Sequence, residues 1–138
     1  MIKNILIPVD GSSSSDKAVK QAVEIAKLSG ATLNFLNVTN ATAAAFDSSI
    51  NEEVTDAWKN ASAAILDRMG YMVPKELQYK KISKIGSPAE IILEYEDFLN
   101  ADLIVMGSRG LGIIKSFLLG SVSQYIVERA KCPVMIVK

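Results

Sequence analysis

The sequence predicts an α/β protein built on a doubly wound, five-stranded parallel sheet with helices on both faces. Short apolar runs alternate along all 138 residues with longer segments whose apolar side chains recur at helical spacing. Two runs, Ile5–Val9 and Ala101–Met106, are nearly continuous, which is typical of strands buried on both faces of a parallel sheet. No repeat, linker or low-complexity tract divides the chain, so we expect one domain over residues 1–138.

The first strand and the first helix are joined by a turn with clear capping signals. The strand Ile5–Val9 ends at Asp10-Gly11, a turn pair, and Ser12–Ser15 follow as candidate helix caps. Asp16 suits the first helical turn, and Gly30 predicts the end of the helix.

The next part of the chain, residues 31–85, predicts a strand, a loop, a helix and an edge strand. Ala31–Val38 is the second strand, and Thr39–Ser49 is polar and without periodicity, as in a loop. The following helix ends at Gly70, and Leu77–Ile85 alternates weakly and carries lysines, which favours an edge strand. The apolar stripe of that helix comprises Ile50, Val54, Ala57, Trp58, Ala61, Ile65 and Met69.

The last part of the chain begins with a helix start at Ser87–Glu90. It offers a serine cap, a proline at the first helical position and a glutamate at the third. The strand Ala101–Met106 comes next and leads into a glycine-rich stretch, Gly107–Ser121. A helix over Val122–Ala130 and a last strand over Pro133–Val137 complete the alternation.

Composition excludes several functional classes. Fifteen basic and fifteen acidic residues cancel, which argues against a nucleic-acid-binding or membrane-surface protein. The single cysteine cannot form an internal disulfide, and the N-terminus lacks the features of a signal peptide. No apolar run approaches the roughly 20 residues that span a bilayer. We therefore expect a soluble, cytoplasmic protein.

The glycine-rich stretch is the strongest functional signal. Glycines at 107, 110 and 120 connect a buried strand to a helix, so backbone amides and a helix N-terminus can face an anion. Gly112 is better explained as part of a surface connection, and Arg109 or Lys115 could contact a phosphate or be solvated. Asp10 and Val38 also lie at the carboxyl ends of predicted strands, and ligands of such sheets bind beyond those ends. We expect a phosphate site in that crevice.

Asp10 has three interpretations. At the end of a strand its carboxylate could accept hydrogen bonds from ribose hydroxyls or help to hold a metal ion. It could accept a phosphoryl group, although Ser12 stands where a second acid is usual. It could simply cap a turn. The glycine-rich stretch favours a ligand contact. That stretch is not a Walker A loop, because no Gly-Lys-Ser/Thr follows four variable residues. It is not a dinucleotide fingerprint either, because that glycine-rich turn should follow the first strand.

Catalytic groups are scarce. The chain has no histidine, the commonest general base. Cys132 precedes the last strand, at the end of the sheet away from the crevice, which favours a structural role. Glu52-Glu53 and Glu96-Asp97 are expected to be helix-surface acids, and Trp58 is expected to pack in a core or an interface.

Five segments resemble universal stress proteins, and together they cover essentially the whole chain. The segments are Ile5–Ser12, Gly86–Glu90, Ala101–Gly110, Leu119–Val122 and Cys132–Val134. Gly107, Gly110, Gly120 and Ser121 match the family's nucleotide pattern, Gly-x2-Gly-x9-Gly-Ser/Thr, which is typical of its ATP-binding branch.

The resemblance implies a Rossmann-like sheet of the adenine nucleotide alpha hydrolase kind, with strand order 3-2-1-4-5 and four helices. It implies ATP as the ligand, with Mg²⁺ bridging phosphate oxygens and no side chain assigned to the metal. The predicted nucleotide-binding residues are Pro8, Val9, Asp10, Val38, Met106, Gly107, Arg109, Gly110, Gly120, Ser121, Val122 and Ser123. A homodimer is implied through the last strand, at Val134, Met135, Ile136 and Val137.

These patterns favour a nucleotide-dependent regulator or sensor in a stress response. Two alternatives stay open. The protein could be a slow ATP hydrolase or phosphotransferase that uses Asp10 or Ser121. It could also be a dimeric interaction module that binds no nucleotide.

Overall fold

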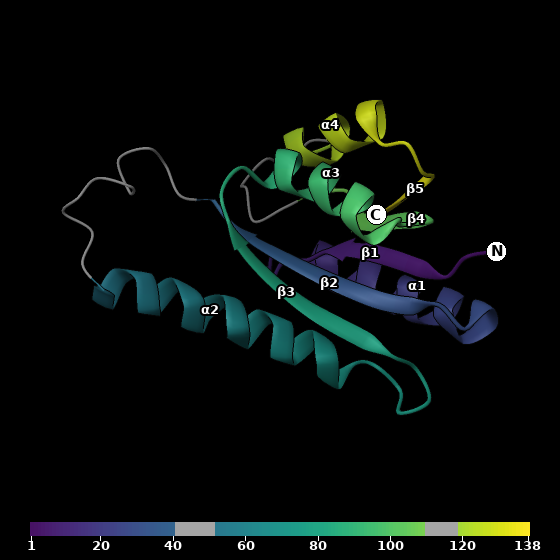
Figure 1. The fold of residues 1–138 in the computed structure, drawn as a ribbon, viewed down its shortest axis with the longest axis horizontal. Helices are drawn as coiled ribbons and strands as arrows, with labels where there is room; N and C mark the ends of the chain where they lie inside the picture. Colours follow the sequence, from purple (N-terminus) through teal and green to yellow (C-terminus); the bar gives the residue numbers. More distant parts are fainter. Residues whose placement is uncertain (41–51, 110–118) are drawn as a thin grey trace.

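Five parallel strands form one sheet in the order β3-β2-β1-β4-β5 (Figure 1). The computed structural model describes residues 1–40, 52–109 and 119–138. The strands are β1 (Asn4–Pro8), β2 (Thr32–Thr39), β3 (Tyr79–Ile85), β4 (Leu103–Gly107) and β5 (Val134–Val137). The helices are α1 (Ser13–Ser29), α2 (Glu52–Tyr71), α3 (Pro88–Leu99) and α4 (Ser121–Arg129). The predicted fold class and strand order are confirmed.

Helices cover both faces of the sheet, α1 and α2 on one and α3 and α4 on the other (Figure 1). Alternate residues of β1 explain this, because Ile5 and Ile7 belong to one apolar core and Leu6 to the other. The first core also contains Val19 and Phe35. In the second core, Leu6 packs with residues of α3 and α4. The sheet is therefore buried on both sides, as the apolar runs predicted.

The first helix begins and ends as its sequence predicts. Ser12 is the N-cap, and its side chain accepts a hydrogen bond from the Ser15 amide at 3.1 Å. Gly30 ends the helix in the left-handed conformation, with φ of 76°. The start of α3 differs in one detail. Ser87 occupies the cap position and Pro88 follows, but the exposed Ser87 makes no side-chain cap bond.

The apolar stripe predicted for α2 is only partly correct. Met69 is buried and Ile65 half-buried, but Ala57 and Ala61 are exposed, and the buried Leu66 was not part of the predicted stripe. The neighbour of Ala61, the polar Ser62, is buried instead. Its hydroxyl pairs with that of Ser83 on β3 at 2.6 Å, so its burial leaves no hydroxyl without a partner. Ile50 and the loop at 41–51 lie outside the described residues, as does the side chain of Val54.

The two edges of the sheet have different characters. β3, the predicted lysine-bearing edge strand, exposes Lys80, Lys81 and Lys84. β5 forms the other edge with the uncharged sequence Val134–Val137, in which Met135 is exposed. Among the described helices, none combines the length and apolar character that crossing a bilayer requires.

Candidate functional site

A cavity of about 510 Å³ lies where β1, β2 and β4 end and α3 and α4 begin. It gathers eleven of the twelve residues predicted from the sequence to bind a nucleotide. They are Pro8, Val9, Asp10, Val38, Met106, Gly107, Arg109, Gly120, Ser121, Val122 and Ser123. The twelfth, Gly110, lies outside the described residues, as do Gly112 and Lys115. Segments more than 100 residues apart therefore meet at one edge of the sheet.

The N-terminus of α4 forms the polar side of this cavity. Its cap residue, Gly120, has extended backbone (φ −60°, ψ 158°) and offers no side chain to the first helical amides. Those amides have no partner within their helix, and the helix dipole adds a partial positive charge there. Such a helix start can bind an anion through backbone groups alone.

The two ends of the glycine-rich stretch are tied together at this place. The Gly120 amide donates to the Ser108 carbonyl at 2.8 Å, and the Ser108 amide donates to the Val137 carbonyl at 3.0 Å. The buried Ser123 hydroxyl lies 3.0 Å from the Gly120 carbonyl and 3.3 Å from that of Ser108. The Ser123 side chain thus fixes the cavity wall, and its amide belongs to the helix start.

Protein packing explains Gly107 but not Gly120. A Cβ on Gly107 would come within 2.8 Å of the main-chain carbon of Ser14, because α1 crosses β4 closely at this point. A Cβ on Gly120 would meet its nearest neighbour, the Ser108 carbonyl oxygen, at 3.4 Å, an ordinary contact. Gly120 also has a backbone conformation open to any residue. The fold would thus accept a small side chain at position 120, so protein packing does not explain the glycine there.

The side of the cavity where β2 and α3 meet is apolar. Six residues of the lining were not predicted: the apolar Leu36, Pro88, Ile92 and Leu119, and the polar Ser15 and Gln124. Leu36 could have been found, because it lies two residues before Val38 and therefore shares its face of the strand. Pro88 and Ile92 could not have been found in this way, because they lie on α3, and the order of the strands decides where that helix begins relative to the cavity.

Asp10 caps its turn, as one of its three interpretations expected, and it also lines the cavity. Its Oδ1 accepts a hydrogen bond from the Ser12 amide at 2.9 Å, as in a capped turn, while Ser12 itself caps α1. Asp10 is half-buried and lines the cavity. Behind it, the buried Asn37 side chain donates to the Val9 carbonyl at 2.8 Å and ties β2 to the end of β1. An asparagine inside an apolar strand was an available but unused signal.

Glu96 was predicted to be a helix-surface acid, and that prediction is wrong. Its side chain is buried, with 5% exposed, and its Oε1 accepts hydrogen bonds from the amides of Lys131 and Cys132 at 2.6 and 2.7 Å. The chain between α4 and β5 has backbone donors that need an acceptor, and the carboxylate supplies it. Asp97 is exposed, as predicted, and pairs with the Lys131 ammonium at 2.9 Å.

Cys132 lies beside Glu96 and away from the cavity. It precedes β5, and only the far end of that strand, Val137, is level with Gly107. Burial, and then the neighbouring Glu96 carboxylate, raises the pKa of its thiol to about 12. A thiol with so high a pKa is a poor nucleophile, which agrees with a structural role.

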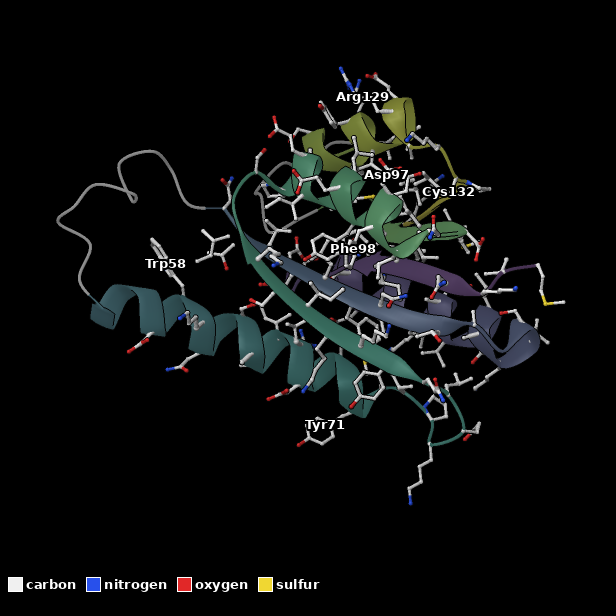
Figure 2. All side chains as sticks on the ribbon, in the orientation of Figure 1. Trp58, Tyr71, Asp97, Phe98, Arg129 and Cys132 are labelled. Carbon is white, nitrogen blue, oxygen red and sulfur yellow. The ribbon has the colours of Figure 1, made fainter. Side chains whose placement is uncertain are left out.

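A second cavity, of about 550 Å³, lies between α2 and β3. Trp58 is half-buried in its wall (Figure 2), rather than in a core. Three of its polar side chains already have partners, since Lys81 pairs with Asp67 at 2.7 Å and Ser83 with Ser62, which lies outside the lining. The first cavity, with its uncapped helix start, is the better candidate for a charged ligand.

The described residues contain no cluster of three or more acidic, histidine or cysteine side chains suited to a metal ion. Over the same residues, the cavity's charged side chains are Asp10 and Arg109. Its polar character otherwise comes from backbone groups, hydroxyls and one amide side chain.

Comparisons with known proteins agree over the whole chain. A model of the universal stress protein family matches residues 1–138. A putative universal stress protein of Staphylococcus aureus (strain USA300) is 36% identical over 143 residues, covering 99% of this chain and 84% of that protein. Universal stress protein UspA from Lactobacillus plantarum has a TM-score of 0.80 at 29% identity, covering 99% and 98% of the two chains. A universal stress protein solved in complex with cAMP has a TM-score of 0.71 at 28% identity, covering 99% and 97%.

Proposed function

The chain belongs to the universal stress protein family, and from that premise we propose that it binds ATP and acts as a nucleotide-dependent regulator or sensor in the cytoplasm. One observation carries the proposal. A single cavity has an apolar side, where β2 and α3 meet, and an uncapped helix start with Gly120 on the other. A nucleotide has the same division, since its base is largely apolar and its phosphates are anionic.

In this proposal the phosphates bind the first amides of α4, beside Gly107, Gly120 and Ser121. Asp10 accepts hydrogen bonds from the ribose hydroxyls, and Val38 contacts the adenine through its main chain. Arg109 lines the same cavity and would add positive charge near the phosphates. Mg²⁺ would be bound mainly by phosphate oxygens, which is how this ion often binds in nucleotide sites.

The family supports an adenine nucleotide, because one similar member was solved in complex with cAMP. The choice of ATP rests on the glycine pattern and on Gly120. Packing leaves room at that glycine, and room near a helix start suits a chain of phosphates.

The substitution Gly120→Asp separates ligand binding from folding. Aspartate is a strong N-cap residue, so we expect α4 to be as stable as before or more stable. The same carboxylate would occupy the helix start and repel phosphate, so we expect the Kd for ATP to rise by about 100-fold or more. Calorimetric titration with MgATP measures binding, and thermal unfolding measures stability.

Gly120→Asn is the matched control, because it caps the helix with a side chain of the same size and no charge. We expect it to weaken ATP binding less than aspartate does. The proposal fails if the wild-type protein binds no ATP, or if Gly120→Asp binds ATP like the wild type. Measuring phosphate release in the same samples tests the alternative of a slow hydrolase.

We also propose that β5 pairs with its counterpart in a second copy to form a homodimer. An edge strand without charges is suited to such pairing, in contrast to the lysine-bearing β3. Met135→Lys would place a charge in that interface, so we expect sedimentation to show a monomer. Leu28→Lys, at a 92% exposed position on α1, should leave the dimer intact. A monomeric wild type would contradict the proposal.

A further inference from the structure

The turn that carries Asp10 is contacted by α2, which lies far along the chain but on the same side of the sheet as α1 (Figure 1). A Cβ on Gly11 would lie 3.4 Å from Ile65 Cδ1, so the helix touches the turn. The Arg68 guanidinium then reaches two groups at once. Its Nη1 lies 2.7 Å from Asp16 Oδ2, and its Nη2 donates to the Gly11 carbonyl at 3.3 Å.

The peptide unit between Gly11 and Ser12 connects Arg68 to Asp10. Its carbonyl accepts from Arg68, and its N–H donates to Asp10 Oδ1 at 2.9 Å. A peptide unit is planar, so these two groups can only turn together. Gly11 has φ of +84°, a region where glycine is favoured, and its freedom would allow this unit to rotate if nothing held it.

We propose that Arg68 is a positioning residue that fixes this peptide unit and thereby orients the Asp10 carboxylate for the ribose of a bound nucleotide. The inference rests on the proposed ATP binding and adds a residue outside the cavity to it. Through Arg68, the position of α2 sets the affinity for ligands that carry ribose hydroxyls.

A purely structural ion pair is the competing explanation. The Arg68 and Asp16 side chains are 48% and 29% exposed, and pairs of this kind contribute little to stability. The bond to the Gly11 carbonyl is different, because it acts on the backbone next to Asp10. Lysine distinguishes the two, since a single ammonium group can pair with Asp16 but lacks the planar fork that reaches both acceptors.

Calorimetric titration with ATP and with 2′,3′-dideoxy-ATP tests the proposal. We expect Arg68→Ala and Arg68→Lys each to raise the Kd for ATP by about fivefold, a typical size for coupling between neighbouring groups. The Kd for dideoxy-ATP should not change, because that ligand lacks the hydroxyls that Asp10 would accept from. Arg129→Ala is the matched control: Arg129 is 49% exposed, paired with Glu128, and lies on α4 (Figure 2). It should bind both ligands like the wild type.

Amide hydrogen exchange at Ser12 tests, without any nucleotide, whether Arg68 holds the Gly11–Ser12 peptide unit in place. We expect faster exchange in Arg68→Ala and Arg68→Lys, with unchanged exchange in the Arg129→Ala control. Equal losses of ATP and dideoxy-ATP affinity, or unchanged affinity for both, would overturn the positioning role. Unchanged Ser12 exchange would show that Arg68 does not fix the peptide unit. A wild type that binds no ATP would instead refute the proposed function and the ribose contact, while the exchange result would still decide whether Arg68 holds the turn.

Discussion

The amino ends of the strands and the start of α4, at the opposite end of the sheet, differ in what accepts their backbone amides. At the amino ends of the strands, the protein's own carboxylates accept them: Glu96 binds two amides before β5, and Asp102 binds those of Lys3 and Asn4 at 2.8 and 2.9 Å. At the carboxyl ends, α4 begins at a glycine that offers no side-chain acceptor.

This difference separates stability from binding. A backbone donor without an acceptor costs free energy when it is buried, so carboxylates at the amino ends stabilise the fold. The same kind of donor at the cavity remains available to a ligand's phosphate. Substitutions of these carboxylates should therefore lower the free energy of unfolding, and substitutions at the start of α4 should mainly change affinity.

Glu96→Ala should have the largest effect on stability. It removes a buried carboxylate and leaves the amides of Lys131 and Cys132 without their acceptor, so we expect a loss of about 3 kcal/mol in the free energy of unfolding. Chemical denaturation measures this loss, and the ATP affinity of the folded protein should not change. Asp97→Ala is the matched control, because that neighbouring acid is exposed and pairs with a lysine side chain instead of backbone amides. Equal effects of the two substitutions would contradict the comparison.

Two glycines of the same predicted motif should respond differently to alanine. At Gly107 the new methyl group would collide with Ser14, so we expect a loss of about 2 kcal/mol in unfolding free energy. At Gly120 the methyl group fits, so we expect a loss below about 1 kcal/mol, the cost of a poorer helix cap. Chemical denaturation of the two variants measures these losses, and ATP titrations of the same variants measure their affinities. A larger loss of stability at Gly120 than at Gly107 would refute the packing argument.

The two ends also differ in how well the sequence predicted them. Strand order, helix starts and cavity residues such as Asp10 and Gly120 followed from local patterns and from the family resemblance. The acceptor role of Glu96 did not, because it depends on α3 meeting the chain before β5, a contact between residues 35 or 36 positions apart. Ser62 was missed for a related reason, since its partner on β3 makes a polar residue acceptable in a buried position.

Asp102 should make stability depend on pH in the acid range. The amides of Asn4 and Lys3, in that order, lower the pKa of its carboxyl from 3.8. A lowered pKa in the folded state means that the stabilisation is complete above pH 3.8 and is lost as the pH falls through the lower value. Asp102→Asn should therefore cost at most about 1 kcal/mol near neutral pH, since the site is partly solvated, and the difference should shrink in acid. Urea denaturation of both proteins at several pH values tests this, and a difference independent of pH would contradict it.

The ion pair between Lys81 and Asp67 should have the smallest effect, because it links two exposed side chains and satisfies no backbone donor. Its hydrogen bond and charge raise the pKa of Lys81 above 10.5, so any stabilisation is present below that pH and lost as the pH rises through the raised value. We expect Lys81→Met to leave the unfolding midpoint unchanged within error at pH 7, with or without added salt. A loss comparable to that of Glu96→Ala would show that a carboxylate here stabilises the fold without being buried or binding backbone amides. The contrast between the two ends of the sheet would then have no physical basis.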